Sequence, residues 1–124
     1  MRTIYLYRNP TGPKKFKAIL PDGSSVRFGQ KGYSDYTIHK DPLRMARYIA
    51  RHGGRPTKYR VPTKVDSVML LRRSSTKENW GMSGIRTPGF WSRWLLWSKP
   101  TIRGAVSYME RKVLGKNYKI IIKN

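Results

Sequence analysis

"GFWSRWLLWSKPT", residues 89–101, decides how this chain folds, because three tryptophans and a phenylalanine fall within eight positions of it. As a helix the stretch is apolar on nearly every side, and Arg93 is its one charge before Lys99. Helices of this kind are usually buried, and crossing a bilayer takes about 20 apolar residues. We therefore interpret the stretch mainly as the core of a small domain. An exposed surface on which nucleic-acid bases stack is the alternative.

The predicted core continues into the next segment. Thr101 is placed to cap a helix that carries one narrow apolar stripe, and Gly115 is placed to end that helix. "YKIII" (118–122) is typical of a β-branched strand that could pair with the first strand of the chain. The predicted core residues are Trp91, Trp94, Leu95, Trp97, Ile102, Val106 and Met109.

Three further side chains are expected near the edge of this core. A short helix can begin at 87–88, and its spacing predicts that Phe90 and Trp94 stack one turn apart. We expect Trp80 and Phe90 to be partly exposed, with Arg93 reaching out from beneath them.

The N-terminal part is predicted to be β-structure. "RTIYLYR" (2–8) alternates between two faces, as a strand does. "KKFKAILPDGSSVRFG" (14–29) is typical of two strands joined by a tight turn, because Pro21 presets one backbone angle and Gly23 tolerates a positive φ. With the helices, these strands predict an α+β fold: one small domain over residues 1–124 with an N-terminal hairpin or sheet.

A basic helix is predicted after this sheet. Asp41 and Pro42 form a typical N-cap and first-turn pair, and the two glycines at 53–54 are a plausible stop. The apolar side of the helix is predicted to consist of Leu43, Ala46, Ile49 and Ala50. The other side is entirely basic, and Tyr48 flanks it. This face is either an ordinary solvated surface or a polyanion-binding one.

Residues 55–77 carry seven basic side chains, one acid and two prolines, which favours an extended basic arm or insertion over a helix. A flexible loop is the alternative, and "VDSVMLL" (65–71) could add a strand to a sheet edge. The predicted polyanion-binding residues of the helix and the arm are Arg44, Arg47, Arg51, Arg55, Lys58, Arg60, Arg72 and Arg73.

The charge balance indicates the class of partner. The 124 residues include 27 Lys and Arg against 6 Asp and Glu, a net charge of +21. Such a charge repels itself within one small domain, so we expect it to face nucleic acid, an anionic membrane surface or an acidic protein. The chain has no cysteine, which excludes disulfides and thiolate metal sites. No signal peptide or membrane-spanning run is predicted, so a soluble or peripheral protein is expected.

An enzyme is not expected. "GYSDYTIHKD" (32–41) is the one cluster with chemical potential, but metal nucleases need several converging acids, and few exist in the chain. His39 and His52 lack the spacing of a metal site. We interpret the cluster as a turn in which Asp35 bonds nearby backbone and the tyrosines pack. No catalytic residue, metal, cofactor or small-molecule substrate is predicted.

Several blocks of the sequence resemble a known family. "FKAIL", "VRFGQKGYSDYTIHKD", "RYIARH", "ENW" and "GFWSRWLLWSKPT" are similar to small, basic, uncharacterised proteins encoded by large double-stranded DNA viruses. The resemblance covers about 14–52 and 78–113, and it implies a viral setting without implying any activity. Relative to that family, the arm, the first strand and "YKIII" are embellishments.

Two functions follow as expectations. The first is a non-enzymatic minor capsid-associated structural protein of a large DNA virus, which bridges major capsid proteins, contacts the internal membrane or the genome, or does both. Its expected location is the virion, and the host cytoplasm or nucleus during assembly. Viral capsid proteins are then the main partners, with nucleic acid or an anionic membrane surface as further ones. The alternative is a sequence-nonspecific nucleic-acid-binding protein that packages or regulates viral DNA.

Overall fold

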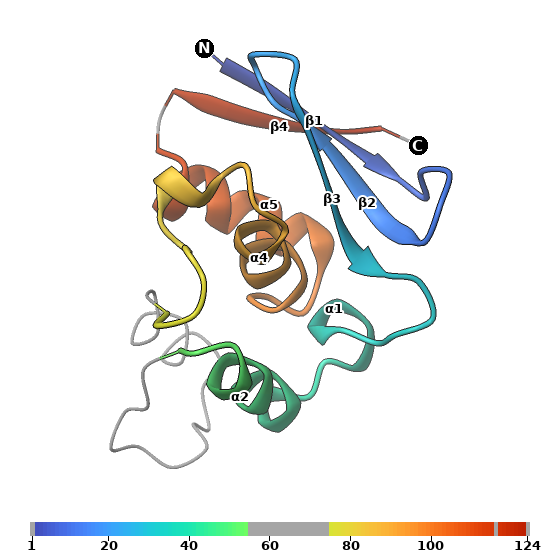
Figure 1. Ribbon diagram of the computed structural model, residues 1–124, viewed down its shortest axis with the longest axis vertical. Helices are drawn as coiled ribbons and strands as arrows, with labels where there is room; N and C mark the ends of the chain where they lie inside the picture. The colour runs from blue at the N-terminus through green and yellow to red at the C-terminus, as the bar shows by residue number, and fades with distance from the viewer. Residues whose placement is uncertain (1, 55–74, 116, 124) are drawn as a thin grey trace.

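Four strands form one mixed sheet, in the order β3-β2-β1-β4 (Figure 1). The computed structural model describes residues 2–54, 75–115 and 117–123. The strands are β1 (Arg2–Arg8), β2 (Lys14–Ile19), β3 (Ser25–Gln30) and β4 (Tyr118–Lys123). The helices are α1 (Tyr36–His39), α2 (Pro42–Arg51), α4 (Pro88–Trp91) and α5 (Ile102–Tyr108), with a 3-10 turn η1 (Met82–Gly84) and two π-helical turns, η2 (Ser92–Leu96) and η3 (Met109–Val113). The predicted α+β fold is confirmed.

The β2–β3 hairpin forms where the sequence predicts it. Gly23 takes a φ of +87° in the turn, and the carboxylate of Asp22 accepts a hydrogen bond of 2.9 Å from the Ser24 amide. The antiparallel register pairs Phe16 with Phe28, and both side chains are buried. One face of the hairpin is therefore core, as alternation in a half-buried sheet requires.

β1 lies between the hairpin and β4. Its Ile4 and Leu6 are fully buried, whereas Tyr5 and Tyr7 point to the exposed face. β4 runs parallel to β1, with Ile4 opposite Ile120, so the predicted pairing of the last strand with the first is confirmed. A parallel pair needs a long crossover connection.

The tryptophan-rich segment begins as an ordinary helix and then widens. The Thr87 hydroxyl accepts a hydrogen bond from the Phe90 amide and caps α4. From Ser92 the bonding shifts to the π pattern, and the Trp97 amide donates to the Ser92 carbonyl at 3.1 Å. The prediction that Phe90 stacks on Trp94 is wrong for this reason, since a π turn breaks the α-helical spacing on which it rested.

The rings pair with other neighbours instead. Phe90 meets Trp91 edge-on, with ring centroids 5.7 Å apart, and Trp94 packs on Tyr108 of α5 at 6.0 Å. Of the seven predicted core residues, Ile102 is half-buried and the others are buried: Trp91, Trp94, Leu95, Trp97, Val106 and Met109.

The expected exposure of Trp80, Phe90 and Arg93 is wrong, because all three are buried. The guanidinium of Arg93 lies 4.5 Å from the ring centroid of Trp94 and 5.2 Å from that of Trp80. Its Nη1 donates a 2.8 Å hydrogen bond to the Trp97 carbonyl. Cation–π contact and this hydrogen bond give the cation partners inside the core, so it has no need to reach solvent.

The apolar face predicted for α2 is also partly wrong. The buried residues of α2 are Met45, Tyr48 and Ile49. Leu43 and Ala46 are half-buried, and Ala50 is exposed. The helix is turned toward its large side chains because Met and Tyr remove more apolar surface from water than Ala does. Its predicted N-cap is confirmed, since the Asp41 carboxylate accepts a hydrogen bond from the Leu43 amide.

Residues 55–74 lie outside the described residues, and with them most of the predicted arm and the predicted strand at 65–71. The chain leaves and re-enters the described part at adjacent points, because Gly54 and Ser75 form an antiparallel bridge. No helix in the described ranges is both long and apolar enough to span a bilayer.

Candidate functional site

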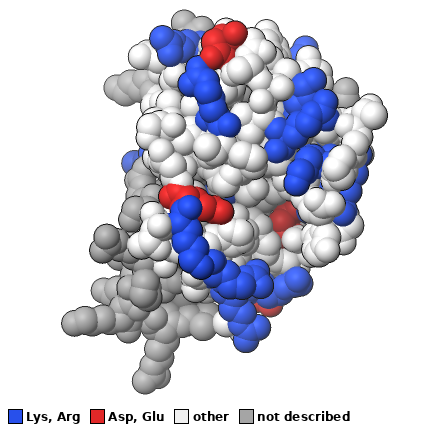
Figure 2. All heavy atoms as spheres, in the orientation of Figure 1, with Lys and Arg blue, Asp and Glu red and all other residues white. Residues whose placement is uncertain are grey.

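The arginines of α2 stand on the molecular surface. Arg44, Arg47 and Arg51 are exposed, and none of them forms an ion pair with another described residue. Figure 2 shows Lys and Arg side chains on both sides of the pale surface between α2 and the strands. The other predicted polyanion-binding residues lie outside the described part of the chain: Arg55, Lys58, Arg60, Arg72 and Arg73.

A pocket of about 490 Å³ opens between α2, the β2–β3 hairpin and the α4–η2 segment. Arg44 and Arg51 line it from α2, and Lys14 and Lys15 line it from the start of β2. Among its described lining residues, Asp35 carries the one carboxylate. The pocket therefore holds an excess of positive charge. Partial enclosure makes such charge act more strongly on an anion than it would on an open surface.

The buried lining of the pocket contains a stack of rings. Tyr48 of α2 stacks on Trp97 with ring centroids 4.3 Å apart, and on its other neighbour, His52, at 4.1 Å. Burial raises the pKa of the Tyr48 phenol, and the nearby Glu78 carboxylate raises it further. The phenol thus stays neutral at physiological pH, and Tyr48 acts as a packing side chain here.

Tyr33 lies at the rim of the pocket, with 70% of its surface exposed. It follows Gly32, whose φ of +88° turns the chain after β3, and its amide donates to the Gln30 carbonyl at 3.3 Å. An aromatic ring is therefore exposed beside Lys14, Arg44 and Arg51, which have no carboxylate partner among the described residues. A flat ring with an open face can stack on a nucleic-acid base.

An ion pair holds the hairpin against α1. The buried carboxylate of Asp35 lies 2.7 Å from the Lys15 ammonium, and its second oxygen accepts a 2.9 Å hydrogen bond from the Thr37 amide. Asp35 is thus both the N-cap of α1 and the partner of one pocket cation. The pocket keeps its positive charge mainly through Lys14, Arg44 and Arg51.

The cluster "GYSDYTIHKD" contains the short helix α1, so the predicted turn is wrong in part, although Asp35 bonds the nearby Thr37 amide as predicted. Asp35 and Asp41 cap α1 and α2, and Tyr36 is buried while Tyr33 is exposed. The Nδ1 atom of His39 accepts a 3.0 Å hydrogen bond from the Asp41 amide. Within the described ranges, no group of three or more metal-ligating side chains comes together. The two carboxylates of this cluster, Asp35 and Asp41, each accept a hydrogen bond from a backbone amide.

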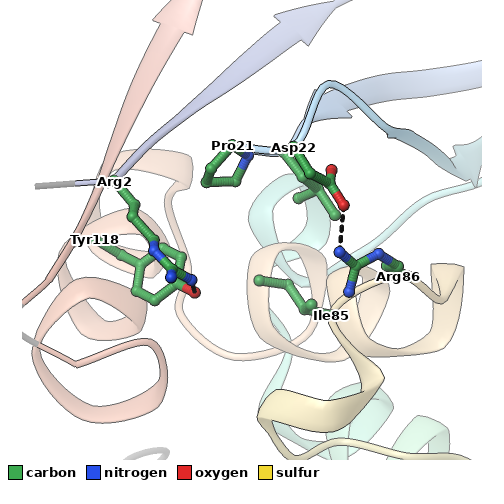
Figure 3. A pocket seen from close by; sticks show the side chains of 7 residues that line it. Arg2, Pro21, Asp22, Ile85, Arg86 and Tyr118 are labelled. Carbon is green, nitrogen blue, oxygen red and sulfur yellow. Dashed lines mark hydrogen bonds and ion pairs between the residues drawn. The ribbon is translucent and has the colours of Figure 1, made fainter.

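A second hollow, of about 360 Å³, lies beside the β2–β3 turn and is shown in Figure 3. Arg86 pairs there with the Asp22 carboxylate, and Nη1 of Arg2 donates to the Tyr118 hydroxyl at 3.1 Å. A hydrogen bond from the Ser24 side chain, together with Arg86, lowers the pKa of Asp22. Because a carboxylate already compensates Arg86, this hollow suits a polyanion less well than the pocket beside α2 does.

The sequence analysis did not assign three residues of the pocket beside α2 to a binding site: Lys14, Lys15 and Tyr33. A lysine pair at the start of a strand is an ordinary surface feature, so composition gave no reason to single it out. What brings these residues to α2 is the docking of the hairpin on the α4–η2 segment. A side chain added at Gly29 would meet Leu96 at 2.9 Å, which shows how close that docking is.

Residues 4–52 match the sequence model of a family of unknown function (DUF5754). No curated protein and no solved structure matches the chain. The matched segment runs from within β1 to the residue after α2, and it supplies most of the residues that line the pocket. The remaining lining residues come from the α4–η2 segment. The segment that matches this family therefore contains the pocket cations Lys14, Lys15, Arg44 and Arg51.

Proposed function

We propose that the protein is a non-enzymatic minor structural protein of a virus particle, which lies beside capsid proteins and binds a polyanion. The polyanion lies on its basic face, the surface formed by Arg44, Arg47 and Arg51 of α2. The viral setting rests on the resemblance of "GYSDYTIHKD" and "GFWSRWLLWSKPT" to proteins of large DNA viruses. The polyanion contact rests on the observation that carries the proposal: Arg44, Arg47 and Arg51 are exposed together and have no ion pair within the described residues.

The use of the carboxylates supports a non-enzymatic role. Each described acid has a hydrogen-bonding task in the fold: capping a helix, closing a turn, binding a tryptophan or holding a strand. These acids are Asp22, Asp35, Asp41, Glu78 and Glu110. General acid–base or metal chemistry needs such groups directed at a substrate. The acids are instead directed at the protein's own backbone and side chains.

The sheet offers edges at which a neighbouring protein could add a strand. β3 and β4 each pair with one strand of the described sheet, so both are edge strands. Strand addition at such an edge is a common way for proteins to associate. On β4 the Glu110 carboxylate already accepts a 2.8 Å hydrogen bond from the Ile120 amide, so a partner strand there must replace this contact.

Cross-linking mass spectrometry on intact purified particles tests the proposal. Lys119 and Lys123 are exposed on β4 and accept an amine-reactive cross-linker. We expect cross-links from these lysines to shell proteins. Lysines that react with the reagent but form no cross-link to any shell protein would overturn the capsid assignment.

A second candidate is a nucleic-acid-binding protein that packages viral DNA. The pocket favours it because Tyr33 lies there with Arg44 and Arg51, which form no ion pair within the described part of the chain. A protein that contacts six to ten phosphates loses about 10³–10⁵ in DNA affinity when the salt concentration rises from 50 to 200 mM. Titration of duplex DNA at several salt concentrations measures this dependence. Weak binding that does not change with salt would exclude this candidate.

A further inference from the structure

We propose that the pocket beside α2 binds one unpaired nucleotide of a single-stranded nucleic acid, with its phosphate on Arg44 and Arg51 and its base against Tyr33. The inference rests on the nucleic-acid contact of the second candidate function. It goes further by naming the form of nucleic acid and the side chain that distinguishes single strands from duplex.

The size of the pocket fits a single nucleotide. Its volume of about 490 Å³ lies within the range of about 300–1,000 Å³ that is common for sites of small organic ligands. A duplex keeps its bases stacked and paired, so it can present only phosphates to a concave site. An unpaired nucleotide can present both a phosphate and an aromatic face.

The charge of the pocket fits a phosphate. Lys15 is paired with Asp35, so among the described lining residues the cations left for a ligand are Lys14, Arg44 and Arg51. Within the described ranges, the hydrogen-bond partner of the Lys14 ammonium is the neutral Gln30 amide oxygen, at 3.4 Å. Arginine binds phosphate through two parallel hydrogen bonds, and the two pocket arginines lie on the same helix, seven residues apart and two turns along its axis.

The rim of the pocket fits a base. Tyr33 is the most exposed large apolar side chain among the described residues, and it stands beside these cations. The stacked rings of Trp97, Tyr48 and His52 line the same pocket. A base that enters the pocket can therefore stack on the open aromatic face of Tyr33.

Binding of labelled oligonucleotides by fluorescence anisotropy tests the inference. The probes are an oligothymidylate of about 12 nucleotides, within the usual site sizes of small single-strand-binding domains, and a duplex of the same length. Thymidine monophosphate, as a competitor, separates a free nucleotide from a nucleotide within a strand. The variants are Tyr33→Ala, Tyr33→Phe and the double substitution Arg44→Gln/Arg51→Gln.

A charge-matched control is available in Arg8→Gln/Arg103→Gln, since both residues are exposed and neither lines the pocket. We expect Tyr33→Ala to weaken single-strand binding by about 5- to 150-fold, the range of one lost stacking contact. Duplex binding should not change, and Tyr33→Phe should bind as the wild type does. The Arg44→Gln/Arg51→Gln protein should lose more single-strand affinity than the control.

Three results would overturn the inference in distinguishable ways. If Tyr33→Ala binds single strands as tightly as the wild type while salt-sensitive binding persists, the pocket assignment fails and the polyanion contact stands. If the wild-type protein binds neither probe, the nucleic-acid candidate fails together with the inference. Competition by thymidine monophosphate as effective as that by the strand would assign the pocket to a free nucleotide.

Discussion

Tyr48 and Trp97 stack face to face, with ring centroids 4.3 Å apart and ring planes inclined by 4°. Tyr48 belongs to the arginine helix α2, and Trp97 follows the tryptophan-rich turn η2. The contact therefore joins the basic surface to the core. It also fixes the rotation of α2, so that Arg44 and Arg51 line the pocket while Arg47 lies outside it. The tryptophans build the core, and through this stack they position the cations.

Tyr48→Ala should lower the free energy of unfolding by about 3–5 kcal/mol, the usual cost of deleting a buried aromatic side chain. Tyr48→Phe keeps the stacked ring and should cost less than about 1.5 kcal/mol. Guanidinium denaturation measures both values. Equal stability of the two variants would show that the stack contributes little to holding α2 on the core.

Arg93 offers a test of the buried cation. Arg93→Lys should destabilise the protein by about 2 kcal/mol or more, because the compact ammonium is more strongly hydrated and cannot lie flat between two rings. Arg93→Met fills a similar volume without a charge and should stay within about 1.5 kcal/mol of the wild type. Denaturation curves of the wild type and the two variants measure these differences in the free energy of unfolding. A lysine variant as stable as the wild type contradicts this account of the Trp80–Arg93–Trp94 contact.

Asp35→Asn should separate the two tasks of Asp35. Asparagine is also a good N-cap, so the cap of α1 should survive, whereas alanine should cost a further 0.5–2 kcal/mol, approximately. Loss of the carboxylate leaves Lys15 unpaired and adds one positive charge to the pocket. Polyanion affinity should therefore rise in Asp35→Asn even as stability falls. Anisotropy titrations check the first effect and thermal denaturation the second. Unchanged affinity would indicate that the polyanion binds elsewhere.

His39 predicts a pH dependence of stability. Burial lowers the pKa of His39 below its ordinary value of 6.5, and the nearby Arg44 lowers it further, against opposing effects of Asp41 and Asp35. The unfolded chain then takes up a proton at higher pH than the folded protein does. The free energy of unfolding should fall as the pH drops through about 6.5 toward the lower folded pKa.

Denaturation midpoints at about pH 7.5 and about pH 5.5, on either side of the ordinary histidine pKa, measure this loss. The His39→Gln protein should show a smaller difference between the two pH values, because it lacks the titrating ring. A wild-type protein that is equally stable at both values would contradict the assignment of a lowered pKa to His39.

The elements that the sequence predicts well are those set by local chemistry. The turn at Asp22 and Gly23, the cap at Asp41 and the helix end at Gly115 each depend on a few neighbouring residues. Strand alternation around Ile4 also follows from local pattern. Short-range rules of capping, turns and alternation suffice for these features.

The features that the sequence predicts poorly depend on contacts between distant segments. The rotation of α2 follows from the stack of Tyr48 on Trp97, which are 49 positions apart in the sequence. The burial of Arg93 follows from its place between Trp80 and Trp94, once η2 has widened into a π turn. The pocket forms only when the hairpin docks beside α2, so Lys14 and Lys15 could not be assigned to a site from pattern alone.

The measurement that tests the proposed function most directly is quantitative mass spectrometry of purified virus particles, separated into shell and DNA-containing core. The account predicts a fixed number of copies per particle that follows the shell and resists a salt wash. Absence from purified particles would contradict it. Copies that follow the DNA and are released by salt would also contradict the capsid role, and would assign the basic face to packaging the genome.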